Sequence, residues 1–206
     1  MKNKKIIIIV ITSVILITIG IISTIFLLNK DENKKEEVTQ KEKLDEMEEY
    51  EYYLEDNATG YYKELYNNLK EILKKEEINE EEYAKTVSQL FVTDLFTLNN
   101  KITSSDIGGL QFIHSDFKED FINIAKTTIY STVESNIYGD RNQELPEVLK
   151  AEVINIEKTK FTYSNEEREA YKVNLSIEYT KDLGYPTTYN LVLIHNDKYL
   201  QVAKGK

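Results

Sequence analysis

The best candidates for acid–base chemistry in this sequence are three side chains: Asp94, His114 and Asp116. A carboxylate beside an imidazole can move a proton at neutral pH when an apolar wall shifts their proton affinities. Asp94 lies between Phe91 and Leu95 in an apolar stretch, so its side chain is a candidate for an inward-facing acid. The non-catalytic alternative makes Asp116 a helix cap, His114 a strand-end residue and Asp94 a partly exposed or capped carboxylate. We favour this alternative.

Other chemical motifs are absent from the sequence or weak. Two histidines, 114 and 195, without a spaced third ligand give no metal motif, and the absence of cysteine excludes disulfides, zinc–thiolate sites and cysteine nucleophiles. Asp106–Gly109 could offer backbone N–H groups to an anion, but no phosphate-loop spacing follows, which favours a turn. We therefore expect no cofactor, no metal and no enzymatic activity.

The sequence contains fifteen tyrosines, a high number for 206 residues. Tyrosine is favoured at interfaces because its ring is apolar and its hydroxyl is polar. Most of these tyrosines are expected to serve the core and the sheet surface. Those named as candidates for a partner-binding or glycan-stacking surface are Tyr61, Tyr62, Tyr163, Tyr185 and Tyr189.

The N-terminal residues predict a membrane anchor. Residues 6–28 form an uncharged run of 23 residues, of which 17 are Ile, Val, Leu or Phe, and Ile6, Leu16 and Leu28 mark its start, middle and end. As a helix this run spans about 35 Å, enough for a hydrocarbon core of roughly 30 Å. It is longer than the apolar region of a signal peptide and has no small-x-small cleavage site, which favours an uncleaved anchor at residues 1–28.

The expected topology places the N-terminus in the cytoplasm and the rest of the chain outside. Lys2, Lys4 and Lys5 precede the run, and the large part that follows it is typical of a single-pass signal-anchor in the cell membrane. The AT-rich codon bias that the composition suggests, together with an outward part that lacks cysteine, indicates a Gram-positive surface. Residues 29–49 are strongly charged and are interpreted as a linker or stalk, which leaves 50–206 as the extracytoplasmic domain.

Net charge limits the possible partners of that domain. The whole chain carries −10, and because residues 1–28 contribute three lysines, the remainder carries −13. Nucleic acids require clustered Lys and Arg, so we expect no nucleic-acid partner. The expected partners are the membrane, through residues 6–28, and other proteins or a second copy of the chain.

Apolar periodicity predicts three helices followed by a sheet. A helix is expected from Thr59 to about Lys75, a second from Asn79 to about Asn99, and a third from Asp116 to Ile137, with Gly139 after its end. A short strand is expected at 110–113. From Val148 the period becomes two, which predicts strands at 148–163 and 171–179 and a hairpin of 189–195 with 198–203. The fold class is α+β, with three helices packed on a curved antiparallel sheet of four to five strands.

The order of these elements, with Leu110–Phe117 as a strand-to-helix junction, resembles the NTF2-like cone fold over about residues 58–204. Enzymes of that superfamily place an Asp/His pair inside the cone, which would give Asp94 and His114 a shared pocket. An NTF2-like domain behind one N-terminal anchor is also similar in layout to VirB8/TcpC-type components of conjugative secretion channels. That similarity implies a role in a secretion or conjugation assembly.

Three functions therefore compete at the level of sequence. The favoured one is a non-enzymatic, membrane-anchored interaction or scaffold domain of the cell envelope. The second is a cone-pocket small-ligand binder or enzyme that uses Asp94 and His114. The third is a wall-glycan binding module that uses surface tyrosines.

Overall fold

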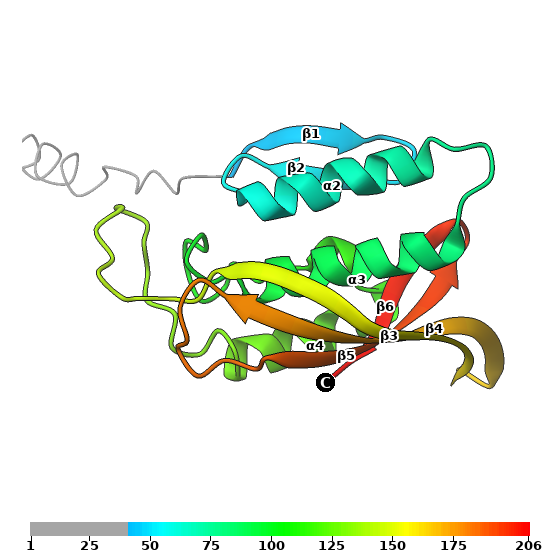
Figure 1. Ribbon diagram of the computed structural model, residues 1–206. Coiled ribbons are helices and arrows are strands. Elements are labelled where there is room, and N and C mark those ends of the chain that lie inside the picture. Colours follow the sequence, from blue (N-terminus) through cyan, green and yellow to red (C-terminus); the bar gives the residue numbers. More distant parts are fainter. Residues whose placement is uncertain (1–40) are drawn as a thin grey trace, which may run out of the picture. The chain divides into compact units, whose positions relative to one another are not determined.

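The computed structural model of the protein describes residues 41–206 and shows an α+β fold. Three α-helices and a short 3-10 helix precede a four-stranded antiparallel sheet, and a two-stranded hairpin precedes them all (Figure 1). The predicted anchor at 6–28 and the first part of the predicted linker, 29–40, lie outside the described residues. The elements are β1 (Lys43–Met47), β2 (Tyr52–Glu55), α2 (Gly60–Leu73), α3 (Glu80–Phe96), η1 (Leu110–Phe112), α4 (Ser115–Thr127), β3 (Val148–Tyr163), β4 (Glu166–Tyr179), β5 (Thr188–Asn196) and β6 (Tyr199–Gly205).

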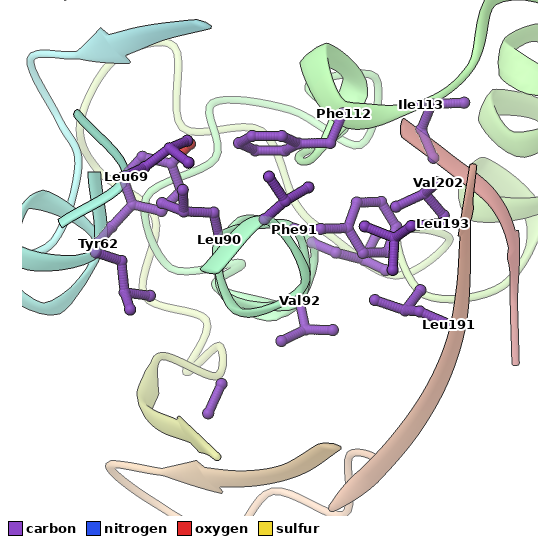
Figure 2. Packing of buried hydrophobic residues seen from close by; sticks show 14 of the residues in the cluster. Tyr62, Leu69, Leu90, Phe91, Val92, Phe112, Ile113, Leu191, Leu193 and Val202 are labelled. Carbon is purple, nitrogen blue, oxygen red and sulfur yellow. The ribbon is translucent and has the colours of Figure 1, made fainter. Parts of the chain in front are cut away.

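Helix α3 is the centre of the fold. It lies between the layer of β1, β2 and α2 and the four-stranded sheet, and eleven of its seventeen residues are buried (Figure 1). Figure 2 shows Leu90 pointing towards Tyr62 and Leu69 of α2, whereas Phe91 points towards Leu193 of β5 and neighbouring sheet residues. The apolar side chains around this helix thus bury it from several sides.

Sequence patterns located the first two helices and the main sheet correctly. Thr59 caps α2 by accepting a hydrogen bond from the Tyr62 N–H at 3.2 Å, and Asn79 caps α3 in the same way with Glu82 at 3.1 Å. The sheet order is β3-β4-β5-β6, all antiparallel. In β4 the alternate residues Val173, Leu175 and Ile177 are buried, as a strand with one covered face requires.

The predicted strand at 110–113 is wrong: Leu110–Phe112 forms the 3-10 helix η1. Only Ile113 makes a bridge, parallel, to Val202 of β6. The cause is Gly109, which has a φ of +78° and packs so closely on α3 that a Cβ atom there would lie 2.8 Å from the Phe91 ring. A backbone bent in this way cannot enter the sheet as an extended strand.

The third helix is shorter than predicted. Helix α4 ends at Thr127, ten residues before Ile137, and its N-cap is His114 instead of Asp116. After the helix, Tyr130 turns into the core, where its hydroxyl donates to the Leu95 carbonyl at 2.8 Å. This tertiary contact prevails over the local helical pattern. Gly139 does adopt a positive φ, of 72°, but in a later turn instead of a helix end.

The structure places a strand inside the segment that the sequence indicated as a linker. Lys43–Met47 forms β1 and pairs with β2. The strand is stabilised by contacts that its own composition does not reveal: Met47 is buried, and the Asp45 carboxylate pairs with Lys70 Nζ of α2 at 2.5 Å. The described fold therefore begins before Tyr50.

On three strands, an edge residue has its backbone groups hydrogen-bonded to side chains, where a neighbouring strand would otherwise pair. In each case both the N–H and the C=O of one residue are bonded, at distances of 2.9–3.2 Å. The pairs are Gln111 with Tyr53 of β2, Tyr61 with Ala151 of β3, and Tyr83 together with Tyr52 at Leu200 of β6. Such caps protect exposed strand edges from unwanted pairing.

Candidate functional site

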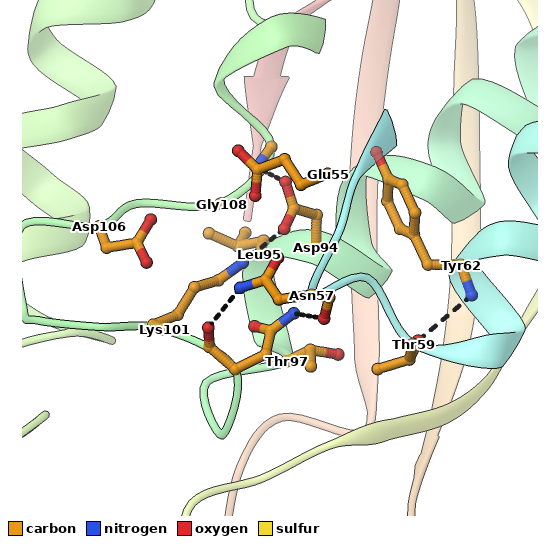
Figure 3. A network of polar contacts seen from close by, with 12 residues as sticks. Glu55, Asn57, Thr59, Tyr62, Asp94, Leu95, Thr97, Lys101, Asp106 and Gly108 are labelled. Atoms are coloured by element: carbon orange, nitrogen blue, oxygen red, sulfur yellow. Dashed lines mark hydrogen bonds and ion pairs between the residues drawn. The ribbon is translucent and has the colours of Figure 1, made fainter. Parts of the chain in front are cut away.

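The Asp94 carboxylate lies at the centre of a polar cluster between α3 and the loop that follows it (Figure 3). Its Oδ1 accepts from Lys101 Nζ at 2.5 Å, and its Oδ2 accepts from the Gly109 N–H at 2.6 Å. The Lys101 side chain is fully buried, whereas 21 % of the Asp94 side chain is exposed. Burial opposes ionisation of Asp94, but the Lys101 ammonium and these hydrogen bonds outweigh it, so the pKa of Asp94 is lowered.

Close backbone approach at Gly108 and Gly109 makes this arrangement possible. A Cβ atom on Gly108 would lie 2.1 Å from the Asp94 carbonyl oxygen, so any side chain there would push the loop off α3. The sequence indicated Asp106–Gly109 as a turn or, less favoured, as a backbone anion site. In the structure the turn binds an anion of the protein itself, the Asp94 carboxylate.

A second ion-pair cluster joins the same loop to the hairpin. Lys41 Nζ lies 2.9 Å from Glu55 of β2 and 2.8 Å from Asp106 of the loop, and 12 % of the Lys41 side chain is exposed. Asp106 also accepts from the Ile102 N–H at 2.9 Å. Glu55 and Asp106, the carboxylates near Asp94, thus both form ion pairs with Lys41, which lies outside α3.

A small cavity of about 20 Å³ opens beside Asp94. On this measure roughly 10–15 Å³ holds one water molecule, so the cavity has room for a single small occupant and not for an organic substrate. Besides Asp94, its walls come from β2, the start of α2, α3 and the following loop. The polar residues around it include Glu55, Asn57, Thr93 and Asn100.

His114 and Asp116 lie apart from this cavity. His114 Nδ1 accepts from the Asp116 backbone N–H at 3.3 Å as the cap of α4, and the backbone N–H of His114 donates to the Val202 carbonyl at 3.1 Å. His114 is 5 % exposed, and its imidazole lies against the rings of Phe117 and Tyr163. Within the described residues His114 neither lines the Asp94 cavity nor shares a hydrogen-bond partner with Asp94. The structure does not bring the predicted acid–base pair together.

Asp116 has a structural partner of its own. Its Oδ2 accepts from the Tyr163 hydroxyl at 2.7 Å, which joins the start of α4 to the tip of the β3–β4 hairpin. The hydroxyl of Tyr163 and that of Ser115 hold the pKa of Asp116 below its ordinary value. Asp116 therefore fixes the hairpin tip to the helix.

The five tyrosines named as interface candidates do not share one surface. Each packs at a different place in the fold, and all five are held by hydrogen bonds or ring contacts. Tyr61 caps β3, Tyr62 accepts from Gln111, Tyr163 bonds Asp116, Tyr185 contacts the Tyr179 ring and Tyr189 packs on Phe96.

A larger groove, which sequence reasoning missed, lies between β2, η1, the start of α4 and the β5–β6 turn. Its volume is about 370 Å³, within the range of sites that accept small ligands or peptide segments. Tyr53 and Lys118 both line it, and within residues 41–206 the Tyr53 hydroxyl and the Lys118 ammonium make no hydrogen bond or ion pair; Tyr53 also lines the small cavity beside Asp94. Its other lining residues include Tyr50, Gln111, Tyr199 and Gln201. These residues come from distant parts of the sequence. The cluster of tyrosines near residue 50 is the one sequence feature that could have indicated the groove.

Metal-binding groups, membrane-spanning helices and related proteins give no further indication of function. Among residues 41–206 no group of three or more His, Asp or Glu side chains is placed to hold a metal ion. In this same part of the chain, no helix combines the length and apolarity needed to cross a bilayer. No protein-family model matches the sequence, and no curated protein and no solved structure is significantly similar to it.

Proposed function

We propose that this chain is a membrane-anchored, extracytoplasmic binding domain of a bacterial cell envelope, which contacts a protein partner through the groove at Tyr53 and Lys118. The anchor is the uncharged run 6–28, with the cytoplasmic N-terminus indicated by Lys2, Lys4 and Lys5. The resemblance in element order to NTF2-like and VirB8/TcpC-type proteins supports a scaffold role in a secretion or conjugation assembly.

The observation that carries this proposal is the contrast between the groove and the acid–base candidates. Asp94, His114 and Asp116 each use their polar atoms to hold the fold together, and the cavity at Asp94 has room for a single small occupant. Among the residues that line the groove, by contrast, Tyr53 and Lys118 have side-chain polar groups that make no hydrogen bond or ion pair within residues 41–206. Tyrosine is enriched at interfaces between proteins, where its ring packs and its hydroxyl bonds the partner.

Site-specific photo-crosslinking in the native bacterium tests the proposal on the full chain. A photoreactive amino acid replaces Tyr53 or Lys118 in the groove, and in a control it replaces Glu64, an exposed residue of α2 outside the groove. We expect one discrete crosslinked adduct from both groove positions and none from the control. Equal labelling from all three positions, or none from any, would contradict the proposal.

The predicted topology has its own test. A reporter that is active only outside the cytoplasm is fused after Lys206, and protease is added to intact wall-stripped cells. We expect an active reporter and loss of the residues beyond about 30. A protected C-terminus would reverse the orientation, and release of a form without residues 1–28 would show a cleaved signal.

A wall glycan is a second candidate ligand for the same groove. Four tyrosines line the groove together with Gln111, Asn196 and Gln201, and sugars are commonly bound by such aromatic and amide groups. Co-sedimentation of the detergent-solubilised chain with purified cell wall distinguishes this candidate. Binding that Tyr53→Ala abolishes would favour the glycan, whereas no co-sedimentation would leave the protein partner.

A further inference from the structure

The cavity beside Asp94 is lined by oxygen atoms that lack hydrogen-bond donors. Thr93 Oγ1, Asn57 Oδ1 and Asn100 Oδ1 are all buried and all without a partner in the described structure, and their residues line this one cavity of about 20 Å³. Thr93 itself is 1 % exposed. A buried acceptor without a donor costs about 1–3 kcal/mol, so three at one place indicate an occupant.

The orientation of both asparagine amides is fixed by the fold. Asn57 Nδ2 donates to the Asn100 carbonyl at 2.8 Å, and Asn100 Nδ2 donates to the Asn57 carbonyl at 3.3 Å (Figure 3). A flip of either amide would place an oxygen against a carbonyl oxygen. Each Oδ1 therefore has to remain the atom without a donor.

Charge decides what the occupant is. The hydroxyls of Thr93 and Tyr53 can donate as well as accept, so hydrogen bonding alone would allow a water molecule here. A water molecule, however, brings no charge to the carboxylates of Glu55 and Asp94, which also line the cavity. Both nearby lysines, Lys41 and Lys101, are bonded to the acids and are not among the residues that line the cavity. Three acids and two lysines, with Asp106 counted, leave one net negative charge at this place.

We propose that this cavity is a binding site for one small monovalent cation of the sodium class. Carbonyl, hydroxyl and carboxylate oxygens are the ligands of hard cations, and one net negative charge matches one positive charge. Divalent calcium takes six to eight oxygens, commonly with several free carboxylates, and here both carboxylates are already paired with lysines. The cation would join the entry to α2 at Asn57, helix α3 at Thr93 and the loop at Asn100.

Sodium should then stabilise the fold as a specific ligand. The full chain in detergent is unfolded with urea at constant ionic strength, while sodium chloride replaces chloride of N-methyl-D-glucamine, a cation too large for the cavity. The near-UV signal of tyrosine reports on the described fold, because all fifteen tyrosines follow residue 49. Above the dissociation constant, each tenfold rise in sodium should raise the folding equilibrium constant about tenfold.

Two matched variants on α3 make the test specific. Thr93→Val keeps the shape of the side chain and removes an oxygen that has no partner, so it should abolish the sodium dependence without loss of stability in sodium-free buffer. Thr86→Val is the same change at a residue that is also 1 % exposed, but its hydroxyl donates to the Glu82 carbonyl. This control should be less stable at every sodium concentration and should keep the wild-type sodium slope.

Three results would overturn the proposal. Equal stability in sodium and in the large organic cation would show that the cavity holds water only. A sodium slope that survives Thr93→Val would place the effect elsewhere. Stabilisation by calcium or magnesium at matched ionic strength, with none by sodium, would show that the site does not take a monovalent cation.

Discussion

Replacing Asp94 by Asn tests whether this carboxylate is part of the structure or a free acid. The substitution keeps the size of the side chain and the bond from the Gly109 N–H, but it removes the charge that pairs with Lys101. Because no part of the Lys101 side chain is exposed, its ammonium would remain buried without a counter-charge. Breaking a buried pair in this way costs about 3–5 kcal/mol. For a domain of this size that corresponds to a fall in melting temperature of about 6–20 °C.

Replacing Asp94 and replacing Lys101 should cost unequal amounts of folding stability. Lys101→Met removes the buried ammonium and leaves an Asp94 carboxylate that still accepts from Gly109 and is 21 % exposed to water. Its cost should therefore be smaller than that of Asp94→Asn. The double variant, with neither charge, should recover most of the loss, since an apolar replacement of a buried pair is often neutral.

Urea unfolding of the full chain, followed by the near-UV signal of tyrosine, measures all three variants. The expected order of stability is wild type, then the double variant and Lys101→Met, then Asp94→Asn. A cost below about 1 kcal/mol for Asp94→Asn, or a greater cost for Lys101→Met, would refute the reasoning from unequal burial.

Two further predictions concern the sheet and the response to acid. Ile177→Ala on the buried face of β4 should lower the free energy of unfolding by about 2–5 kcal/mol, whereas Ser176→Ala on the opposite face should lower it by less than about 1 kcal/mol. Equal losses in urea unfolding would contradict the one-sided burial of this strand. The pKa of Asp94 is lowered in the folded protein, so its stabilising contribution is complete above the unfolded value of about 3.9 and is lost as the pH falls through the lower folded value. Stability measured between pH 5 and pH 2 should therefore fall less steeply in the double variant of Asp94 and Lys101 than in the wild type, and parallel curves would exclude Asp94 as the group responsible.

The sheet could be predicted from sequence because its signal is local. Strand β3 has the predicted bounds, 148–163, and the alternation from Tyr171 to Tyr179 lies within β4. A strand with one buried face repeats its apolar residues at every second position, so no distant contact is needed to locate it. The caps of α2 and α3 are local in the same sense, since each joins residues three positions apart.

The errors arise where distant contacts prevail over the local pattern. Helix α4 ends early because Tyr130 reaches the Leu95 carbonyl, 35 positions away in the sequence. The cavity beside Asp94 depends on Asn57 and Asn100, which are 43 positions apart and bond each other's backbone. No spacing rule relates such residues. Asp94 was singled out as a candidate inward-facing acid, but its side chain is 21 % exposed and its partner is Lys101, not the predicted His114.

The capped strand edges narrow the way in which a partner can bind. A partner strand that tried to extend the fold at Tyr53 of β2 or Leu200 of β6 would find both backbone groups already bonded by side chains. The caps on β6 persist at any physiological pH, because burial raises the pKa of Tyr83 to about 12 and raises the pKa of Tyr52 well above its ordinary value. Recognition in the groove between these two strands should therefore depend on side chains, above all Tyr53 and Lys118, and not on added β-pairing. The same argument gives many of the tyrosines a structural reason, because a buried hydroxyl can bond the backbone N–H and C=O groups that an edge strand exposes.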